Sequence, residues 1–278
     1  MRGPKVGLAL GGGGARGLAH IGVLKVFEQE KLPIDFLSGA SMGGIIAAGY
    51  ASGLNAAQLE AIALEMADFR NMVRLLDVRP RRRGLLEGKR VREFLVEKLG
   101  IDLNFDQLRM PLVMTATDLL RGKEVVLKSG SVIDAVMATS AFPGVFQAVY
   151  CGDQMLVDGG MLNNVPAEPV RQLGAQVVIA VCVTPQYPRD EIPARSLKTR
   201  LLPPIFPRFS EEIYRAAMVM SAEITRIRLQ EAQPEVVLYP EIPDDLSMFL
   251  GFPRAAEVIA AGEKAARQAF PQIMKLVE

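Results

Sequence analysis

The sequence predicts an α/β protein with three layers, in which helices cover both faces of a mostly parallel central sheet. Short, uninterrupted apolar runs such as 6–10 are bounded by glycines, which is typical of strands buried on both faces. Segments with apolar residues at helical spacing separate these runs, so strands and helices alternate along the chain. The first two runs also end in glycine-rich turns, as expected at the carboxyl edge of such a sheet. We expect residues 1–278 to form a single domain.

The individual elements follow from these patterns. The most β-rich run of the chain is 177–183, and it predicts a buried strand. Ser131 is followed three residues later by Asp134, as in a capping box, and Pro143 lies beyond the end of the helix that this box opens. The expected strands are 6–10, 34–38, 113–117, 124–127, 155–157, 177–183 and 236–239, and the expected helices are 18–32, 44–51, 54–76, 91–99, 131–139, 167–173, 211–230 and 253–277.

Composition and charge exclude several classes of function. Lys and Arg number 32 and Asp and Glu number 31, so the net charge of +1 gives no overall field that would attract nucleic acid or a membrane. Cys151 and Cys182 have no C-x-x-C spacing, so we expect reduced thiols without a disulfide or a metal site. The uncharged interval 36–59 is rich in glycine, and we expect it inside the fold rather than across a membrane. With no secretion signal visible, we expect a cytoplasmic protein.

Residues 34–44 end an apolar run in Gly-x-Ser-x-Gly and then become helical. A sharp turn from strand to helix holds the hydroxyl of Ser41 clear of its own backbone, and Gly39 and Gly43 remove Cβ atoms that would collide there. The N–H groups at the start of the following helix favour negative charge above the serine. Ser41 is therefore the expected nucleophile.

The glycine run after the first strand allows two interpretations. Gly12-x-Gly14-x-x-Gly17 matches a dinucleotide-binding pattern, but the chain lacks the acidic residue expected at the end of the second strand and has Ser41 there instead. Read together with the serine, Gly12, Gly13 and Gly14 form a backbone nest, and such a nest can act as an oxyanion hole. Arg16 either supports the shape of this loop or offers charge to an anionic group.

The base that activates Ser41 cannot belong to a Ser-acid-His triad in that order, because His20 is the only histidine and precedes the serine. His20 could still approach Ser41 from the neighbouring helix, but it lies among apolar residues, as expected of a hydrogen-bonded core histidine. The base is then a carboxylate, a lysine or absent. Asp158 ends an apolar strand and is followed by Gly159, which puts a carboxylate where open parallel sheets place their sites. Desolvation would raise its proton affinity and make it a general base.

Three sequence blocks, 12–17, 39–43 and 158–160, resemble the motif blocks of the patatin-like phospholipase family, in particular its small bacterial members. The segments 116–119 and 138–143 extend the resemblance. It covers roughly residues 5–185, which leaves 186–278 as a loop and a C-terminal helical extension.

The resemblance implies hydrolysis of lipid acyl esters by a Ser-Asp dyad. It assigns Ser41 as the nucleophile, Asp158 as the base and Gly12 to Gly14 as oxyanion donors, with Arg16, Gly39, Gly43 and Gly159 in support. It implies neither a metal nor a cofactor, and its partner is a lipid or fatty-acyl ester. A non-catalytic lipid- or nucleotide-binding module and an acyltransferase remain open as alternatives.

Several features allow more than one use. The basic run Arg79–Arg83 could touch anionic headgroups at the inner membrane surface, although such runs are commonly solvated loops. The proline-rich segment 184–210 is a candidate lid. Apolar stripes such as the one on helix 211–230 are usually core, but an acyl channel or the seam of a homo-oligomer would look the same. Its members are Ile213, Ala217, Met220, Ile224 and Ile227.

Overall fold

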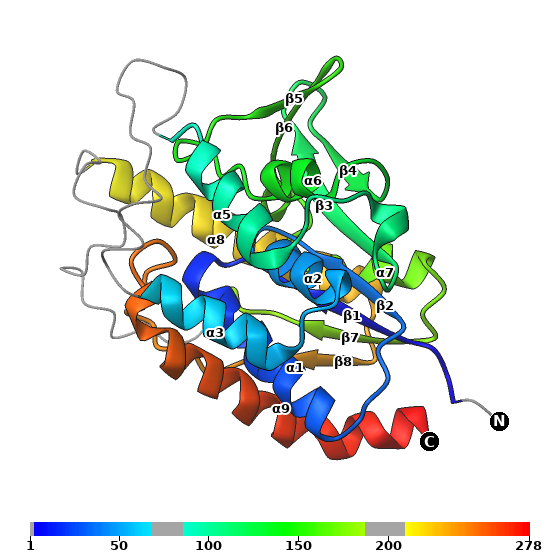
Figure 1. The fold of residues 1–278 in the computed structure, drawn as a ribbon. Coiled ribbons are helices and arrows are strands. Elements are labelled where there is room, and N and C mark those ends of the chain that lie inside the picture. The colour runs from blue at the N-terminus through cyan, green and yellow to red at the C-terminus, as the bar shows by residue number, and fades with distance from the viewer. Residues whose placement is uncertain (1–2, 68–85, 187–208) are drawn as a thin grey trace.

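The computed structural model describes residues 3–67, 86–186 and 209–278 (Figure 1). In this part of the chain one eight-stranded sheet has the strand order β5-β6-β3-β2-β1-β7-β8, with β4 paired to β3 off this path. The pairs β1–β2, β1–β7, β2–β3 and β7–β8 are parallel, and those of β3 with β4, β3 with β6 and β5 with β6 are antiparallel. The strands are β1 (Val6–Leu10), β2 (Phe36–Gly39), β3 (Leu112–Asp118), β4 (Lys123–Leu127), β5 (Val149–Cys151), β6 (Gln154–Asp158), β7 (Val177–Val181) and β8 (Val236–Leu238).

Helices cover both faces of the sheet, which confirms the predicted three-layer α/β/α arrangement (Figure 1). Successive side chains of β1 point alternately to the two faces of the sheet. Leu8 and Leu10 belong to a large apolar core with α1, α2, α3, α5, α6 and α9, whereas Ala9 faces a second core formed with α7 and α8. The helices are α1 (Ala19–Gln29), α2 (Met42–Ser52), α3 (Ala56–Ala67), α5 (Lys89–Leu99), α6 (Val132–Thr139), α7 (Ala167–Gln172), α8 (Phe209–Ala232) and α9 (Ala255–Val277).

Most of the expected elements are found within a few residues of their predicted bounds, whereas the part 68–76 of the expected helix 54–76 lies outside the described residues. The helix that starts after Ser131 has the predicted cap, since the Ser131 hydroxyl accepts the N–H of Asp134 at 3.3 Å. Gly53, in a left-handed conformation, ends α2 as the glycine break predicts. The short strand β5 was not expected, because three residues give no alternation that could be recognised.

The apolar stripe expected on this helix, α8, is only partly buried, since Ala217 and Ile224 are half-buried and the other members are exposed. Ile213 and Met220 are each 64% exposed, and Ile227 is also exposed. The buried side of this helix instead carries Tyr214 and Leu229. Arg79–Arg83 and nearly all of the candidate lid 184–210 lie outside the described residues. Within the described residues, no helix combines the length and the apolar character needed to span a membrane.

Candidate active site

The predicted site residues gather at the carboxyl ends of strands in the middle of the sheet. The glycine run 11–14 follows β1, Ser41 follows β2, and Thr184 follows β7 on the other side of β1. The chain order of the strands reverses around β1, and the crevice at such a reversal is where open α/β sheets bind ligands. Asp158 joins this group from β6.

Ser41 occupies a strained turn between β2 and α2. Its backbone has φ 50° and ψ −124°, and only three non-glycine residues of the described chain have a positive φ. A Cβ on Gly39 would lie 2.6 Å from the backbone of Gly43, and one on Gly43 would lie 2.1 Å from the carbonyl oxygen of Leu10. The turn therefore requires glycine on both sides of the serine, which is the steric reason for the Gly-x-Ser-x-Gly spacing.

A threonine of α6 holds this turn in place. The backbone N–H of Ser41 donates to Oγ1 of Thr139 at 3.0 Å, and the same hydroxyl donates to the carbonyl of Thr115 in β3 at 2.6 Å. Thr139 is fully buried, so water does not replace either bond. The strained conformation of Ser41 is thus tied to the central sheet through one side chain.

The glycine run lies against the serine. A Cβ on Gly12 would be 3.0 Å from Cβ of Ser41. The N–H of Gly12 donates to the carbonyl of Asn164 at 3.1 Å, and the Asn164 amide donates to the carbonyl of Gly12 at 3.1 Å. Among the described residues, no acceptor bonds the N–H groups of Gly13 and Gly14. This geometry corrects one expectation, because the N–H of Gly12 is already used and is not available as an oxyanion donor.

His20 supports the glycine run from within the core. Its Nε2 lies 2.6 Å from the carbonyl oxygen of Gly11. Burial lowers the pKa of His20 to about 4, although the bond to Gly11 raises it, so the imidazole is neutral near pH 7. A carbonyl only accepts, so Nε2 carries the proton and the buried Nδ1 is left without a partner. The expected structural role of His20 agrees with this geometry.

Arg16 is buried and braces the same loop. Its Nε donates to the carbonyl of Val183 at 2.9 Å, and Nη1 donates to the carbonyl of Pro243 at 3.1 Å. Of the two uses expected from the sequence, these bonds support the shape of the loop. Arg16 also lines the cavity next to Ser41, so its charge acts on whatever enters.

Asp158 is the last residue of β6, and its side chain reaches Ser41. The residue is 3% exposed, and it lines the same cavity as Ser41, close enough for the serine hydroxyl to act on the pKa of its carboxyl. The N–H of Gly160 donates to Oδ1 of Asp158 at 2.8 Å. Burial raises the pKa of Asp158 to about 6, although the bonds from Ser41 and Gly160 lower it. A carboxylate with this pKa is ionised near pH 7 and binds a proton more readily than an ordinary aspartate.

The position of Asp158 depends on the register between β3 and β6. Gly39 at the end of β2 lies opposite Met114, and Asp158 lies opposite Ala116, only two positions further along β3. A Cβ on Gly159 would lie 2.2 Å from the carbonyl oxygen of Thr115, so the chain can turn there only with glycine. The ends of β2 and β6 are therefore brought to the same part of β3.

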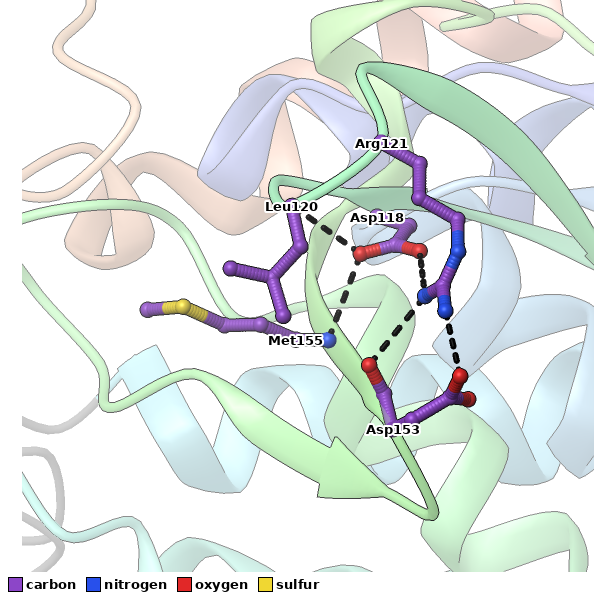
Figure 2. A network of polar contacts seen from close by, with 5 residues as sticks. All are labelled: Asp118, Leu120, Arg121, Asp153 and Met155. Carbon is purple, nitrogen blue, oxygen red and sulfur yellow. Dashed lines mark hydrogen bonds and ion pairs between the residues drawn. The ribbon is translucent and has the colours of Figure 1, made fainter.

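Figure 2 shows the polar network that secures this register at the far end of β3. The buried Asp118 accepts the N–H of Leu120 at 3.0 Å and that of Met155 in β6 at 3.3 Å. Arg121 donates to Asp118 at 2.9 Å and also pairs with Asp153, at the turn into β6. The Arg121 guanidinium holds the pKa of Asp118 below its usual value. The sequence predicted a turn residue at Asp118, and the structure adds this link to the strand of Asp158.

A cavity opens between Ser41, Asp158 and α8. Its volume is about 70 Å³, and its wall combines the glycine run with aromatic and aliphatic side chains. Ser221 of α8 donates to the carbonyl of Gly160 at 3.2 Å, which docks the helix on the turn after Asp158. The apolar part of the wall comes from Phe142, Met161, Tyr214, Met218, Leu246 and Met248.

Sequence reasoning missed the residues that connect the blocks. Thr139, Asn164 and Ser221 each act through contacts between segments far apart in the chain. Asn164 also donates to the hydroxyl of Thr184 at 2.7 Å, so one amide joins the glycine run to the end of β7. A polar residue inside an apolar stretch, such as Thr139 at the end of α6, is the one signal that could have identified these positions.

The sequence is similar to several known proteins. The family model for patatin-like phospholipase matches residues 8–171, which is more than half of the chain. An uncharacterised NTE family protein of Mycobacterium tuberculosis is 34% identical over 180 residues, which are 64% of this chain and 49% of that protein. The mouse patatin-like phospholipase domain-containing protein 6 is 33% identical over 195 residues, which are 68% of this chain and 14% of that protein.

Solved structures are more distant. VipD from Legionella pneumophila aligns with 98% of this chain and 67% of its own, with a TM-score of 0.47 and 12% sequence identity. The alignments with the Mycobacterium tuberculosis and mouse relatives cover about half or less of the length of those proteins.

Proposed function

Because the chain belongs to the patatin-like phospholipase family, a family of lipid hydrolases, we propose that it is a serine acyl-ester hydrolase of the phospholipase or lysophospholipase type. One observation carries the proposal. The hydroxyl of Ser41, the carboxyl of Asp158 and the glycine run line a single cavity, and the only histidine of the chain is neutral, buried and bonded to Gly11.

In the proposed reaction, Oγ of Ser41 attacks the carbonyl carbon of the ester while Asp158 takes the hydroxyl proton. The carbonyl oxygen becomes an oxyanion. When the tetrahedral intermediate collapses, the bond to the leaving alcohol breaks, and Asp158 returns the proton to that alcohol. Water then attacks the acyl-Ser41 ester with Asp158 again as base, which releases the fatty acid and restores the hydroxyl.

The N–H groups of Gly13 and Gly14 are the proposed oxyanion donors. They lie in the loop that packs on Ser41, and the first N–H of α2, from Met42, adds a donor at a helix N-terminus. One donor of this kind contributes roughly 3 to 4 kcal/mol to lowering the barrier. Asn164 supports the proposal indirectly, because its two bonds to Gly12 set the path of the loop.

Two other functions use the same fold. A binding module would hold a lipid or nucleotide without turnover, and an acyltransferase would pass the acyl group from Ser41 to an alcohol other than water. The raised pKa of Asp158 favours an enzyme, since burying a carboxylate beside a serine costs stability and gives nothing to a simple binding site.

Hydrolysis of p-nitrophenyl butyrate and of lysophosphatidylcholine by purified wild type and Ser41→Ala tests the proposal. We expect turnover by wild type and loss of at least 10³-fold in Ser41→Ala. Added glycerol separates the acyltransferase, which would form acylglycerol in place of free fatty acid. Equal rates for wild type and Ser41→Ala would overturn the proposal.

A further inference from the structure

A second cavity lies between α1, α2, α3 and α5, on the face of the sheet that carries the large apolar core. It measures about 150 Å³, and the described residues that line it are all apolar. Its wall consists of Leu18, Ile21, Met42, Ile45, Ile46, Leu59, Ile62, Ala63, Met66, Val91, Phe94, Leu95, Leu99 and Phe252. Protein interiors are otherwise close-packed, and cavities of this size lined by Leu, Ile and Phe stay dry and take up apolar molecules.

Three separate segments of the chain each contribute residues to the walls of both cavities. Along α2, Ser41 lines the first cavity and Met42 the second. The 3-10 turn that follows the glycine run contributes Arg16 to the first and Leu18 to the second. Before α9, Met248 lines the first and Phe252 the second. The two cavities are therefore neighbours along three stretches of chain.

Met42, next to Ser41 in the sequence, is the residue of the apolar cavity that lies nearest the serine along the chain. A Cβ on Gly17 would lie 2.6 Å from Cγ of Met42, so this side chain rests on bare backbone. Methionine is unbranched and flexible, and its side chain can change rotamer without loss of a hydrogen bond. Met66 gives the wall a second adaptable side chain.

The two cavities differ in chemistry in the way that a lipid ester requires. The one at Ser41 combines its apolar wall with Arg16, Asn164, Ser221 and Asp244, which suit the polar end of an ester. Its volume of about 70 Å³ is about half that of the apolar cavity. Among the described residues, the lining of the apolar cavity offers no hydrogen-bonding side chain, so a polar headgroup would be desolvated against it without compensation.

We propose that this apolar cavity is the acyl-chain site, in which the alkyl tail of a lipid ester lies when its carbonyl carbon is at Ser41. The inference rests on the proposed function and adds the site that determines selectivity for the length of the acyl chain. Methylene groups that enter the cavity leave water, and each adds affinity up to the end of the cavity. Because the side chains of α2, α3 and α5 that line the cavity are apolar, longer acyl chains should be preferred until the cavity is filled.

Filling the cavity tests the assignment. Ala63 is buried and lines it, whereas Ala61 is exposed on the same helix, so Ala63→Phe and Ala61→Phe form a matched pair. We expect Ala63→Phe to lower the ratio of kcat/KM for p-nitrophenyl dodecanoate to that for p-nitrophenyl butyrate at least tenfold, and Ala61→Phe to leave the ratio unchanged. Should Ala63→Phe fail to fold, Ile62→Phe, at a half-buried lining position, replaces it. A ratio that stays within twofold of wild type in the folded filling variant would overturn the assignment.

Binding separates this inference from the proposed function. Dodecanoate, below its micellar concentration, is titrated calorimetrically into Ser41→Ala and into Ser41→Ala carrying Ala63→Phe. One bound equivalent, weakened at least tenfold by the filling substitution, supports the chain site even if wild type hydrolyses no ester. Binding that Ala63→Phe does not weaken, or no binding at all, would contradict it.

Discussion

The hydroxyl of Thr139 accepts the backbone N–H of Ser41 at 3.0 Å while it donates to the carbonyl of Thr115 at 2.6 Å. One side chain thus connects the strained turn of the nucleophile to β3, the strand against which Asp158 is also aligned. A backbone in a sparsely populated conformation persists only when its surroundings over-determine it. We expect this connection to govern both the activity and the stability of the site.

Thr139→Val removes the hydroxyl and keeps the shape of the side chain. It leaves a buried N–H and a buried carbonyl without partners, at a cost of about 1–3 kcal/mol. If that cost falls on the reactive position of Ser41, kcat falls roughly 5- to 150-fold with little change in KM. Steady-state kinetics on p-nitrophenyl butyrate measures the split. Thr139→Ser, which retains the hydroxyl, is the control, and equal kcat in Thr139→Val and wild type would remove Thr139 from the positioning machinery.

Activity should follow the ionisation of Asp158. Its pKa is raised to about 6, and only the carboxylate form accepts the proton of Ser41. We therefore expect kcat/KM to rise about tenfold per pH unit below pH 6 and to become level above about pH 7. His20, with a pKa lowered to about 4, adds no transition near pH 6.5. Initial rates between pH 4.5 and 8.5, corrected for spontaneous hydrolysis, give the profile, and a profile flat across pH 6 would argue against Asp158 as the base.

The raised pKa of Asp158 also means that its ionised carboxylate lowers the free energy of unfolding at neutral pH. A carboxyl whose folded pKa is raised stabilises the fold only while it is protonated, and that contribution is lost as the pH rises from about 4 to about 6. The shift corresponds to a cost on the order of 3 kcal/mol at pH 7. Asp158→Asn should therefore be inactive and yet have a higher Tm than wild type at pH 7.5.

Calorimetry at two pH values checks this prediction. The gain in Tm of Asp158→Asn should disappear near pH 4, where wild type also carries a neutral side chain at this position. Asp102→Asn, at an exposed position, is the matched control and should change Tm at neither pH. A variant less stable than wild type at pH 7.5 would show that the ionised carboxylate is well compensated in the fold.

The network of Figure 2 predicts a pH-dependent contribution of opposite sign. The pKa of Asp118 is lowered, chiefly by the bond from Arg121, so this pair stabilises the fold above the ordinary pKa of an aspartate and loses its effect as the pH falls through the lowered value. Arg121→Met should lower Tm at pH 7 and have a much smaller effect near pH 3. Because Asp118 also aligns Met155 in β6, the variant should lose kcat more than KM. Unchanged Tm at pH 7 would mean that the backbone bonds to Asp118 alone secure β6.

Much of this architecture could be predicted because it depends on local patterns. Val6–Leu10 and Val177–Val181 are apolar at every position, which only a strand buried on both faces tolerates, and both form central strands. The position of Ser41 between β2 and α2 follows from the steric needs of Gly39 and Gly43, which the sequence states directly.

The remainder depends on contacts that no local pattern contains. That the N–H of Gly12 bonds to Asn164 is decided by the packing of two loops more than 150 residues apart. On α8, sequence periodicity predicted the helix but not its buried side. Ile213 and Met220 have the spacing of a core stripe and are exposed, whereas Tyr214 and Ser221, on another side of the helix, line the site. Periodicity predicts a helix, whereas the shape of the neighbouring surface decides which side is buried.

Covalent labelling tests whether Ser41 is the nucleophile and Asp158 its base. Wild type, Ser41→Ala, Asp158→Asn and His20→Gln are treated with a fluorophosphonate, digested, and the modified residue is identified by mass spectrometry. We expect one adduct, on Ser41, formed at a comparable rate in His20→Gln, at least 100-fold more slowly in Asp158→Asn, and not at all in Ser41→Ala. An adduct on another residue, or labelling of Ser41 that needs His20 and not Asp158, would contradict it.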